Sequence, residues 1–248
     1  MLGCDWFLRF KSQKSMKKFL FVLLPVLLAG LPTARAADII GTITLNGTPP
    51  PEVPYTPLMN DSTCGAMYTT PPTTHFYVVG SNHELADAIV SLKGVAGKST
   101  GASQPPVTLD QKGCLYVPQI LVMQTGQKLV VKNSDPCIHN VHCLPAVSGN
   151  PESNQVQMPG GPELDFTFSQ PERFMKFKCD VHPWMFAWVT VIDSPYYCLS
   201  DKDGKFIIKN VPPGKYTVEA DHRKLGTLTE DVEVKDSNVT VDFAFDVK

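Results

Sequence analysis

The seven residues CDVHPWM, at positions 179–185, place a thiol, an imidazole and a thioether at three-residue intervals: Cys179, His182 and Met185. The strand-like runs FMKFKC (174–179) and FAWVTVI (186–192) flank them, so the seven residues form a short loop between two predicted strands. Given the numbers of Cys, His and Met in the chain, a C-x2-H-x2-M match is expected by chance only about once in 200 cases. The loop therefore indicates a metal site.

The rest of the chain predicts an all-β protein. Runs rich in Val, Ile, Thr and Phe, such as PQILVM, KLVVKN and ELDFTF, are separated by turn sequences such as QTGQ and MPGGPE. No amphipathic helix is expected after residue 40. The formal net charge of -2 gives no electrostatic reason to expect binding to nucleic acid or to an acidic membrane surface.

Residues 1–36 are predicted to be a signal peptide. A basic stretch precedes the apolar run FLFVLLPVLLAGL, and Ala34–Ala36 has the small-x-small pattern of a cleavage site. The run is too short, and too interrupted by proline, to predict a permanent membrane span. Met16 is a candidate start residue beside Met1. We therefore expect a periplasmic or secreted protein with no membrane span after signal removal.

Three further parts follow the signal. Residues 37–106 hold strand-like runs around a Pro- and Thr-rich segment, which we expect to be extended on the surface and pinned at Cys64. Residues 107–193 hold the metal loop and most of the predicted strands. Residues 194–248 alternate apolar and polar side chains, a pattern typical of a separate small β-sandwich.

A fourth candidate ligand lies upstream, in the run NSDPCIHNVH at 133–142, where His139 is expected at the end of a strand and is followed by Asn140. A single copper ion that cycles between two oxidation states favours two imidazoles and one thiolate in a plane, with a weak axial thioether. His139, Cys179, His182 and Met185 supply that set. A loop and a neighbouring strand can bring these four side chains to one point.

At these residues the chain resembles the cupredoxins, most closely the amicyanin-like type, which has both the HNVH run and the C-x2-H-x2-M loop. The resemblance implies a Greek-key β-sandwich, one type 1 blue-copper centre and electron transfer. It also implies that His139, Cys179 and His182 are the strong ligands and that Met185 is the axial ligand. The wider combination resembles secreted cupredoxin-like proteins labelled as methylamine-utilisation proteins.

The resemblance further implies that Asn140 hydrogen-bonds to the Cys179 loop and restrains the ligand geometry. Asp180 is a departure, because such proteins often carry Ser or Thr at that position. The departure puts the supporting hydrogen bond in question.

The tail resembles the carboxypeptidase regulatory-like, or transthyretin-like, domains through its DxDGxF...NVPPGxYxV pattern at Asp201–Val218. The runs GTITLNGTPPP (41–51) and LADAIVSLKG (85–94) resemble the first two strands of that family. We therefore hypothesise that residues 107–193 are inserted into a β-sandwich built from both ends of the chain. Pairing of residues 39–45 with the 107–193 block alone would contradict this hypothesis.

Other metal sites fit the residues less well. A binuclear copper centre would need a second cysteine in the loop, but position 175 is Met175. Multicopper oxidases need several HxH pairs, and the sequence has none. A zinc site would not use a thioether. A metal-free cupredoxin is the remaining alternative.

The other cysteines leave several pairings open. Cys64 with Cys114 is the favoured disulfide, because it would tie the Pro-rich segment to the start of the inserted block. Cys137 and Cys143 flank the first candidate ligand and could bridge each other or remain buried thiols. Cys198 has no obvious partner.

The other histidines are expected to be structural. His142 lies three residues after His139, on the opposite face if the strand continues, and is expected to be structural. His75, His83 and His222 are isolated, and surface positions are expected for them.

These observations predict a carrier of single electrons and not an enzyme. The imidazole edge of His182 is expected at the surface, ringed by Pro183, Trp184 and Phe186 as a docking patch for brief contact with a redox protein. That partner could be a c-type cytochrome or a dehydrogenase. Two alternatives are a copper-binding carrier and a non-redox structural or interaction module.

Overall fold

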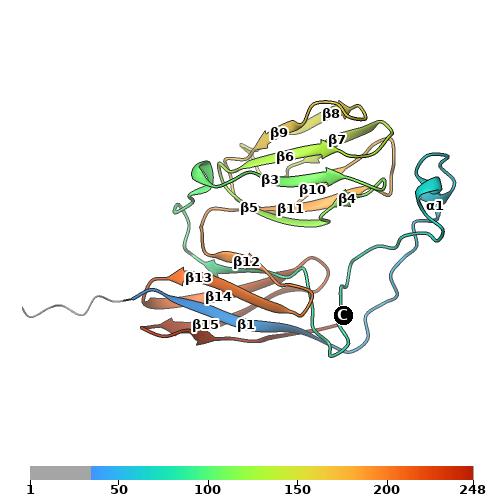
Figure 1. The fold of residues 1–248 in the computed structure, drawn as a ribbon. Helices are drawn as coiled ribbons and strands as arrows, with labels where there is room; N and C mark the ends of the chain where they lie inside the picture. The colour runs from blue at the N-terminus through green and yellow to red at the C-terminus, as the bar shows by residue number, and fades with distance from the viewer. Residues whose placement is uncertain (1–34, 248) are drawn as a thin grey trace, which may run out of the picture. The chain divides into compact units, whose positions relative to one another are not determined.

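The computed structural model of the chain describes residues 35–247. The predicted signal peptide lies outside the described residues except for its last two positions, as do Met1 and Met16. Nearly all regular structure from 35 to 247 is β-strand (Figure 1), which confirms the predicted all-β class. Helix is limited there to α1 (Thr56–Met59) and the 3-10 turns η1 (Gly65–Met67) and η2 (Gly101–Ser103). None of these has the length and apolarity needed to cross a bilayer.

The strands between residues 107 and 192 form two sheets, which we call the first sandwich. One sheet has the order β4-β3-β6-β9 and the other the order β5-β11-β10-β7-β8. Two pairs, β3 with β6 and β11 with β5, are parallel, and the others are antiparallel. The strands are β3 (Val107–Gln111), β4 (Tyr116–Val117), β5 (Ile120–Gln124), β6 (Lys128–Asn133), β7 (His139–Leu144), β8 (Ser153–Gln157), β9 (Leu164–Thr167), β10 (Glu172–Lys178) and β11 (Phe186–Ile192).

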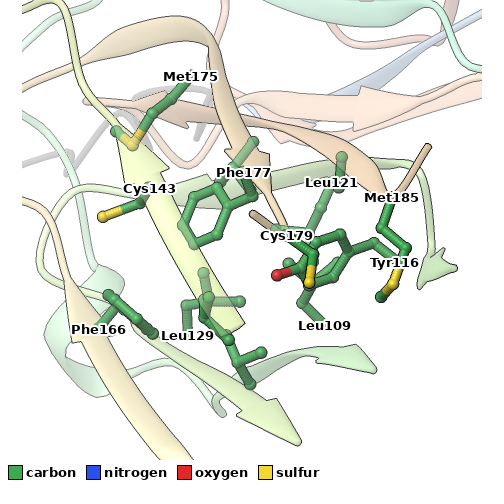
Figure 2. Close-up of a cluster of buried hydrophobic side chains, with 14 of the residues drawn as sticks. Leu109, Tyr116, Leu121, Leu129, Cys143, Phe166, Met175, Phe177, Cys179 and Met185 are labelled. Carbon is green, nitrogen blue, oxygen red and sulfur yellow. The ribbon is translucent and has the colours of Figure 1, made fainter. Parts of the chain in front are cut away.

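The alternation of side chains along β10 and β7 places the candidate ligands in the core. Successive residues of a strand face opposite sides of the sheet. Met175 and Phe177 on β10 are therefore buried together with Cys179, the first residue after the strand. Figure 2 shows these three side chains in one buried cluster. On β7 the same period buries His139 and Cys143.

The second sandwich combines strands from both ends of the described chain. In one sheet β1 pairs with β13 on one side and with β16 and β17 on the other, so that Ile39 lies opposite both Ile208 and Val239. In the other sheet β2 lies between β12 and β14, in the order β12-β2-β14-β15. This is the pairing that the insertion hypothesis requires. The strands are β1 (Ala37–Asn46), β2 (Ile89–Lys93), β12 (Tyr197–Leu199), β13 (Lys205–Val211), β14 (Gly214–His222), β15 (Gly226–Val234), β16 (Val239–Thr240) and β17 (Phe243–Asp246).

His222 lies at the end of β14, and the prediction that it is on the surface is wrong. Its side chain is buried, and its ring packs against Tyr77 and Phe245 with centroid distances of 6.0 and 6.1 Å. This burial lowers the pKa of His222 to about 4. His75 and His83 are exposed, as predicted.

Residues 53–74 form a segment that we call the cover segment, and it is less extended than predicted. It contains α1 and η1, and its residues Tyr55, Leu58 and Cys64 are buried in the same apolar cluster as the strands of the first sandwich. The Tyr68 hydroxyl donates a hydrogen bond of 2.7 Å to the carbonyl of Gly113. The core of the first sandwich therefore extends beyond the block 107–193 that the sequence indicated.

Candidate metal centre

Two elements present the candidate ligands. His139 is the first residue of β7, and the loop 179–185 joins β10 to β11, which pair as neighbours in the same sheet as β7. Within the loop, the N–H of Cys179 donates to the carbonyl of Met185 at 3.1 Å. The N–H of Met185 donates in turn to the carbonyl of His182 at 2.9 Å. These two bonds fold the seven residues back on themselves and fix the directions of their side chains.

The structure brings three of the four predicted ligands together. The Nδ1 atoms of His139 and His182 face each other at 2.9 Å, and the Sγ atom of Cys179 lies 3.7 Å from Nδ1 of His182. One donor atom from each of these residues lies within 4.8 Å of the other two. All three side chains are buried, with exposed fractions of 0%, 5% and 2% for His139, His182 and Cys179. Buried polar atoms that converge in this way can jointly hold one ion.

Met185, the predicted axial ligand, is completely buried in the same apolar cluster. Figure 2 shows its thioether at the end of the cluster where Cys179 and Tyr116 also lie. The Tyr116 hydroxyl donates a hydrogen bond of 2.9 Å to the carbonyl of Asn140. The Tyr116 ring therefore links the start of β7 to this end of the apolar cluster. The thioether that the loop pattern predicts as the fourth donor therefore lies in the same apolar cluster as Cys179.

The surroundings of two of the three donors, Cys179 and His182, favour the forms that bind metals. Burial raises the pKa of Cys179, but hydrogen bonds from His139 and from the backbone N–H of Asn140 outweigh burial, and the net shift is downward. Burial, and then the neighbouring His139, lower the pKa of His182. Metal ions bind thiolates and neutral imidazoles. A readily ionised thiol beside a neutral imidazole therefore suits a metal site.

Asp135 orients His139, and the sequence analysis missed it. Its Oδ2 atom lies 2.9 Å from Nε2 of His139, and its two carboxylate oxygens accept the N–H groups of Gly113 and Cys114 at 2.6 and 2.7 Å. Burial lowers the pKa of His139, but the bonds to Asp135 and Cys179 outweigh burial and raise it overall. A carboxylate on the outer nitrogen fixes the ring and leaves Nδ1 for a metal. The available signal was an acidic residue four positions before a candidate ligand.

Asn140 connects β7 to the Cys179 loop as the resemblance implied. Its backbone N–H points at Sγ of Cys179 at 3.4 Å, and its side-chain oxygen accepts the N–H of Asp180. The departure at Asp180 does not remove this restraint, because the Asp180 carboxylate also accepts a bond of 3.3 Å from the Asn140 amide. Lys178 and this amide hold the pKa of Asp180 far below its usual range.

His142 faces away from the three donors, as the strand period predicts. Its Nδ1 and Nε2 atoms lie 2.9 Å from carboxylate oxygens of Asp180 and Glu152. It therefore supports the outer side of the Cys179 loop and contributes no donor to the buried cluster.

The surface around His182 differs from the predicted docking patch, because the His182 ring is buried and does not reach the surface. The cover segment lies over it: Oδ2 of Asp61 is 3.9 Å from Nε2 of His182. Trp184 and Phe186 are only half exposed, and Phe186 packs against the Tyr55 ring at a centroid distance of 6.3 Å. Pro183 is exposed. The Pro- and Thr-rich sequence of the cover segment has no hydrophobic periodicity, so it did not predict this contact with His182.

The cysteine pairing is partly as favoured. Cys64 and Cys114 form a disulfide with an S–S distance of 2.00 Å. Among the described residues Cys137, Cys143 and Cys198 are unpaired. Cys137 and Cys143 therefore do not bridge each other: the Cys143 thiol lies 3.6 Å from the Pro151 carbonyl, while the Cys137 thiol lies 3.6 Å from Nε2 of His139.

Comparison with known families gives a match for the tail. Residues 196–248 match a family described as BOS complex subunit NOMO1-like, second beta sandwich domain. This agrees with the β-strands that the structure shows there. A search of curated proteins found no match.

Three solved structures to which parts of this chain are similar can be named. A copper-containing nitrite reductase (NirK) from Thermus scotoductus SA-01 is 22% identical with a TM-score of 0.32, over 35% of this chain and 22% of that one. The chain thus spans about a fifth of that enzyme's length. A purple cupredoxin from Nitrosopumilus maritimus is 21% identical with a TM-score of 0.29, over 34% of this chain and 98% of that one. A mutant amicyanin in its Cu(I) form is 18% identical with a TM-score of 0.32, over 41% and 97%.

Proposed function

We propose that the protein binds one type 1 copper ion and carries single electrons between redox proteins in the periplasm or outside the cell. The observation that carries this proposal is the convergence of His139 Nδ1, His182 Nδ1 and Cys179 Sγ in a buried cluster. Two imidazoles, one thiolate and a thioether are the donor set that suits copper in both of its oxidation states. Met185 completes that set from the apolar side.

Copper, when bound, supplies one-electron oxidation and reduction. The residues of the chain supply a rigid frame for it. Asp135 fixes the ring of His139, Asn140 joins β7 to the loop, and the main-chain bonds of residues 179–185 fix Cys179 and His182. Because the frame is buried and hydrogen-bonded, we expect little movement when the charge of the site changes. A small movement of the ligands favours rapid electron transfer. In this proposal the site exchanges electrons and does not convert a substrate.

The surface around the loop would meet the redox partner, a c-type cytochrome or a dehydrogenase. Ile138 and Val181, which directly precede the two histidine ligands, are 44% and 57% exposed. Together with Pro183 they replace the predicted patch of Pro183, Trp184 and Phe186. Exposed apolar residues of this kind suit small, short-lived interfaces.

A second role is proposed for the other sandwich. The match of residues 196–248 to a β-sandwich domain, and the absence of metal-donor groups there among the described residues, favour a non-redox structural or interaction module. A copper-binding carrier is the alternative role for the first sandwich, because the cover segment lies over His182, the ring through which an electron would pass to a partner. One experiment distinguishes an electron carrier from a copper-binding carrier.

The experiment is the visible spectrum and voltammetry of the purified protein with one equivalent of Cu(II). We expect a strong thiolate-to-copper band and a reversible one-electron wave. A copper-binding protein that lacks both would contradict electron transfer and favour the carrier. Protein that binds no copper would contradict both roles.

A further inference from the structure

Three cysteines outside the proposed ligand set gather beside the two imidazoles. Cys64 and Cys114 form the disulfide, and Sγ of the unpaired Cys137 lies 3.7 Å from Sγ of Cys114. The sulfur atoms of Cys64 and Cys137 and a ring nitrogen of His182 also lie within 4.8 Å of one another. Thiol–disulfide exchange begins when a thiol sulfur approaches a disulfide sulfur. The three cysteines have this arrangement.

Hydrogen bonds hold the backbones of both cysteines in the approaching pair. The carboxylate of Asp135 accepts the N–H of Cys114 at 2.7 Å, and the side-chain amide of Asn133 donates to the carbonyl of Cys137 at 2.9 Å. Asn133 and Asp135 are themselves linked, because the N–H of Asp135 donates to Oδ1 of Asn133 at 3.0 Å. The contact between Cys114 and Cys137 is therefore held by the turn after β6.

The third cysteine is held from the cover segment. Oδ1 of Asp61 accepts the N–H groups of Thr63 and Cys64 at 2.9 and 2.8 Å. Cys64 therefore keeps its place on the cover segment through this turn, independently of its sulfur. Loss of the disulfide bond would not require Cys64 to unfold.

We propose that Cys64, Cys114 and Cys137 form an internal thiol–disulfide exchange site. The thiolate of Cys137 attacks Sγ of Cys114, a Cys114–Cys137 bond forms, and the Cys64–Cys114 bond breaks. Cys64 leaves as a thiolate and takes up the proton that Cys137 gave up. One disulfide and one thiol are present before and after, so the step needs no external oxidant or reductant. It goes beyond the proposed function and needs no metal.

Exchange changes the attachment of the cover segment. In the Cys64–Cys114 form, a covalent bond holds this segment over His182, with Asp61 at 3.9 Å from the ring. In the Cys114–Cys137 form, the segment keeps only non-covalent ties such as the bond from Tyr68 to Gly113. The same step leaves a free thiol on the cover segment. Exchange thus alters access to the imidazole that the segment covers.

The first experiment maps the disulfides of the full, metal-free chain. The protein is held at about pH 8.5, then quenched in acid to stop exchange, unfolded and alkylated before peptide mapping. We expect a Cys114–Cys137 peptide and alkylated Cys64 in the wild type, with Cys64 labelling reduced roughly tenfold in Cys137→Ser. Cys143→Ser is the matched control, because Cys143 is also unpaired and buried but contacts a carbonyl, and it should behave as the wild type.

Two results of this mapping would overturn the proposal: no Cys114–Cys137 peptide in the wild type, or equal Cys64 labelling in the wild type and Cys137→Ser. A second variant covers the case in which Cys137→Ser fails to fold. Cys64→Ser leaves Cys114 without its partner, and mild oxidation with diamide should then join Cys114 to Cys137. Failure of that pair to form would equally contradict the exchange site.

Discussion

The Nδ1 atoms of His139 and His182 lie 2.9 Å apart, although 43 positions separate the two residues in the chain. Each ring turns its other nitrogen toward a carboxylate: Nε2 of His139 lies 2.9 Å from Asp135, and Nε2 of His182 lies 3.9 Å from Asp61. Both rings are thus oriented from outside, with their inner nitrogens beside the sulfur of Cys179.

Replacement of the central thiol should remove the colour of the copper protein. In Cys179→Ser no thiolate remains to donate charge to copper, so the strong visible band should be lost. The matched control is Cys143→Ser, which changes another buried thiol of the same cluster on neighbouring β7 and should keep the band. Absorption spectra of both variants with one equivalent of Cu(II) make the comparison. A coloured Cys179→Ser would contradict the ligand assignment.

Replacement of the thioether should keep the colour and raise the reduction potential. The axial ligand is weak, and its identity tunes the potential of such sites. Met185→Leu removes a donor that stabilises the oxidised ion and fills the same apolar volume. Met175→Leu, another buried methionine of the cluster, should leave the potential unchanged. Cyclic voltammetry would measure both, and equal potentials for Met185→Leu and the wild type would argue against an axial role.

Neutralising Asp135 should weaken copper binding. In Asp135→Asn, the amide cannot accept all three bonds that the carboxylate accepts from His139, Gly113 and Cys114, so the His139 ring loses its fixed direction. Loss of such a support typically costs about 10–100-fold in metal affinity. Competition with a copper chelator measures the change. Asp165→Asn, on an exposed pair with Lys128, is the control and should bind as the wild type does.

The cluster of His139, Cys179 and His182 could be predicted from sequence because most of its pattern is local. Three of the four donors lie within seven residues, and strand alternation is enough to bury Cys179 and to turn His142 outward from His139. The disulfide between Cys64 and Cys114 is favoured by the sequence because it ties the Pro-rich segment to the start of the next block.

The covering of His182 could not be predicted, because it depends on contacts between distant segments. Asp61 stands in a Pro- and Thr-rich stretch with no periodic pattern, and the packing of Tyr55 and Leu58, together with the Cys64–Cys114 disulfide, brings that stretch to the site. The burial of His222 could not be predicted for the same reason. Its burial follows from aromatic rings at Tyr77 and Phe245, far away in the chain.

A single methyl group added to β1 should test whether both ends of the chain build one sandwich. A Cβ atom at Gly41 would collide with the carbonyl oxygen of Val241 and the ring of Phe206, which belong to the C-terminal part of the chain. We expect Gly41→Ala to lower the free energy of unfolding by about 2 kcal/mol or more, since rigid backbone cannot move aside. Lys205→Ala, exposed on neighbouring β13, should stay within about 0.5 kcal/mol of the wild type in urea titrations. Equal stability of the two variants would contradict the shared sheet.

Acidification should destabilise the protein through His222. Burial holds the pKa of its ring at about 4 in the folded chain. An unfolded histidine titrates near pH 6.5, so between those values the unfolded state binds more protons and the free energy of unfolding falls as the pH falls. His222→Phe keeps a ring between Tyr77 and Phe245 but cannot bind the proton. Relative to this variant, the wild type should lose about 3 kcal/mol between pH 7 and pH 4. Urea titrations across that range measure the difference, and parallel pH profiles for the two proteins would show that His222 is not buried in its neutral form.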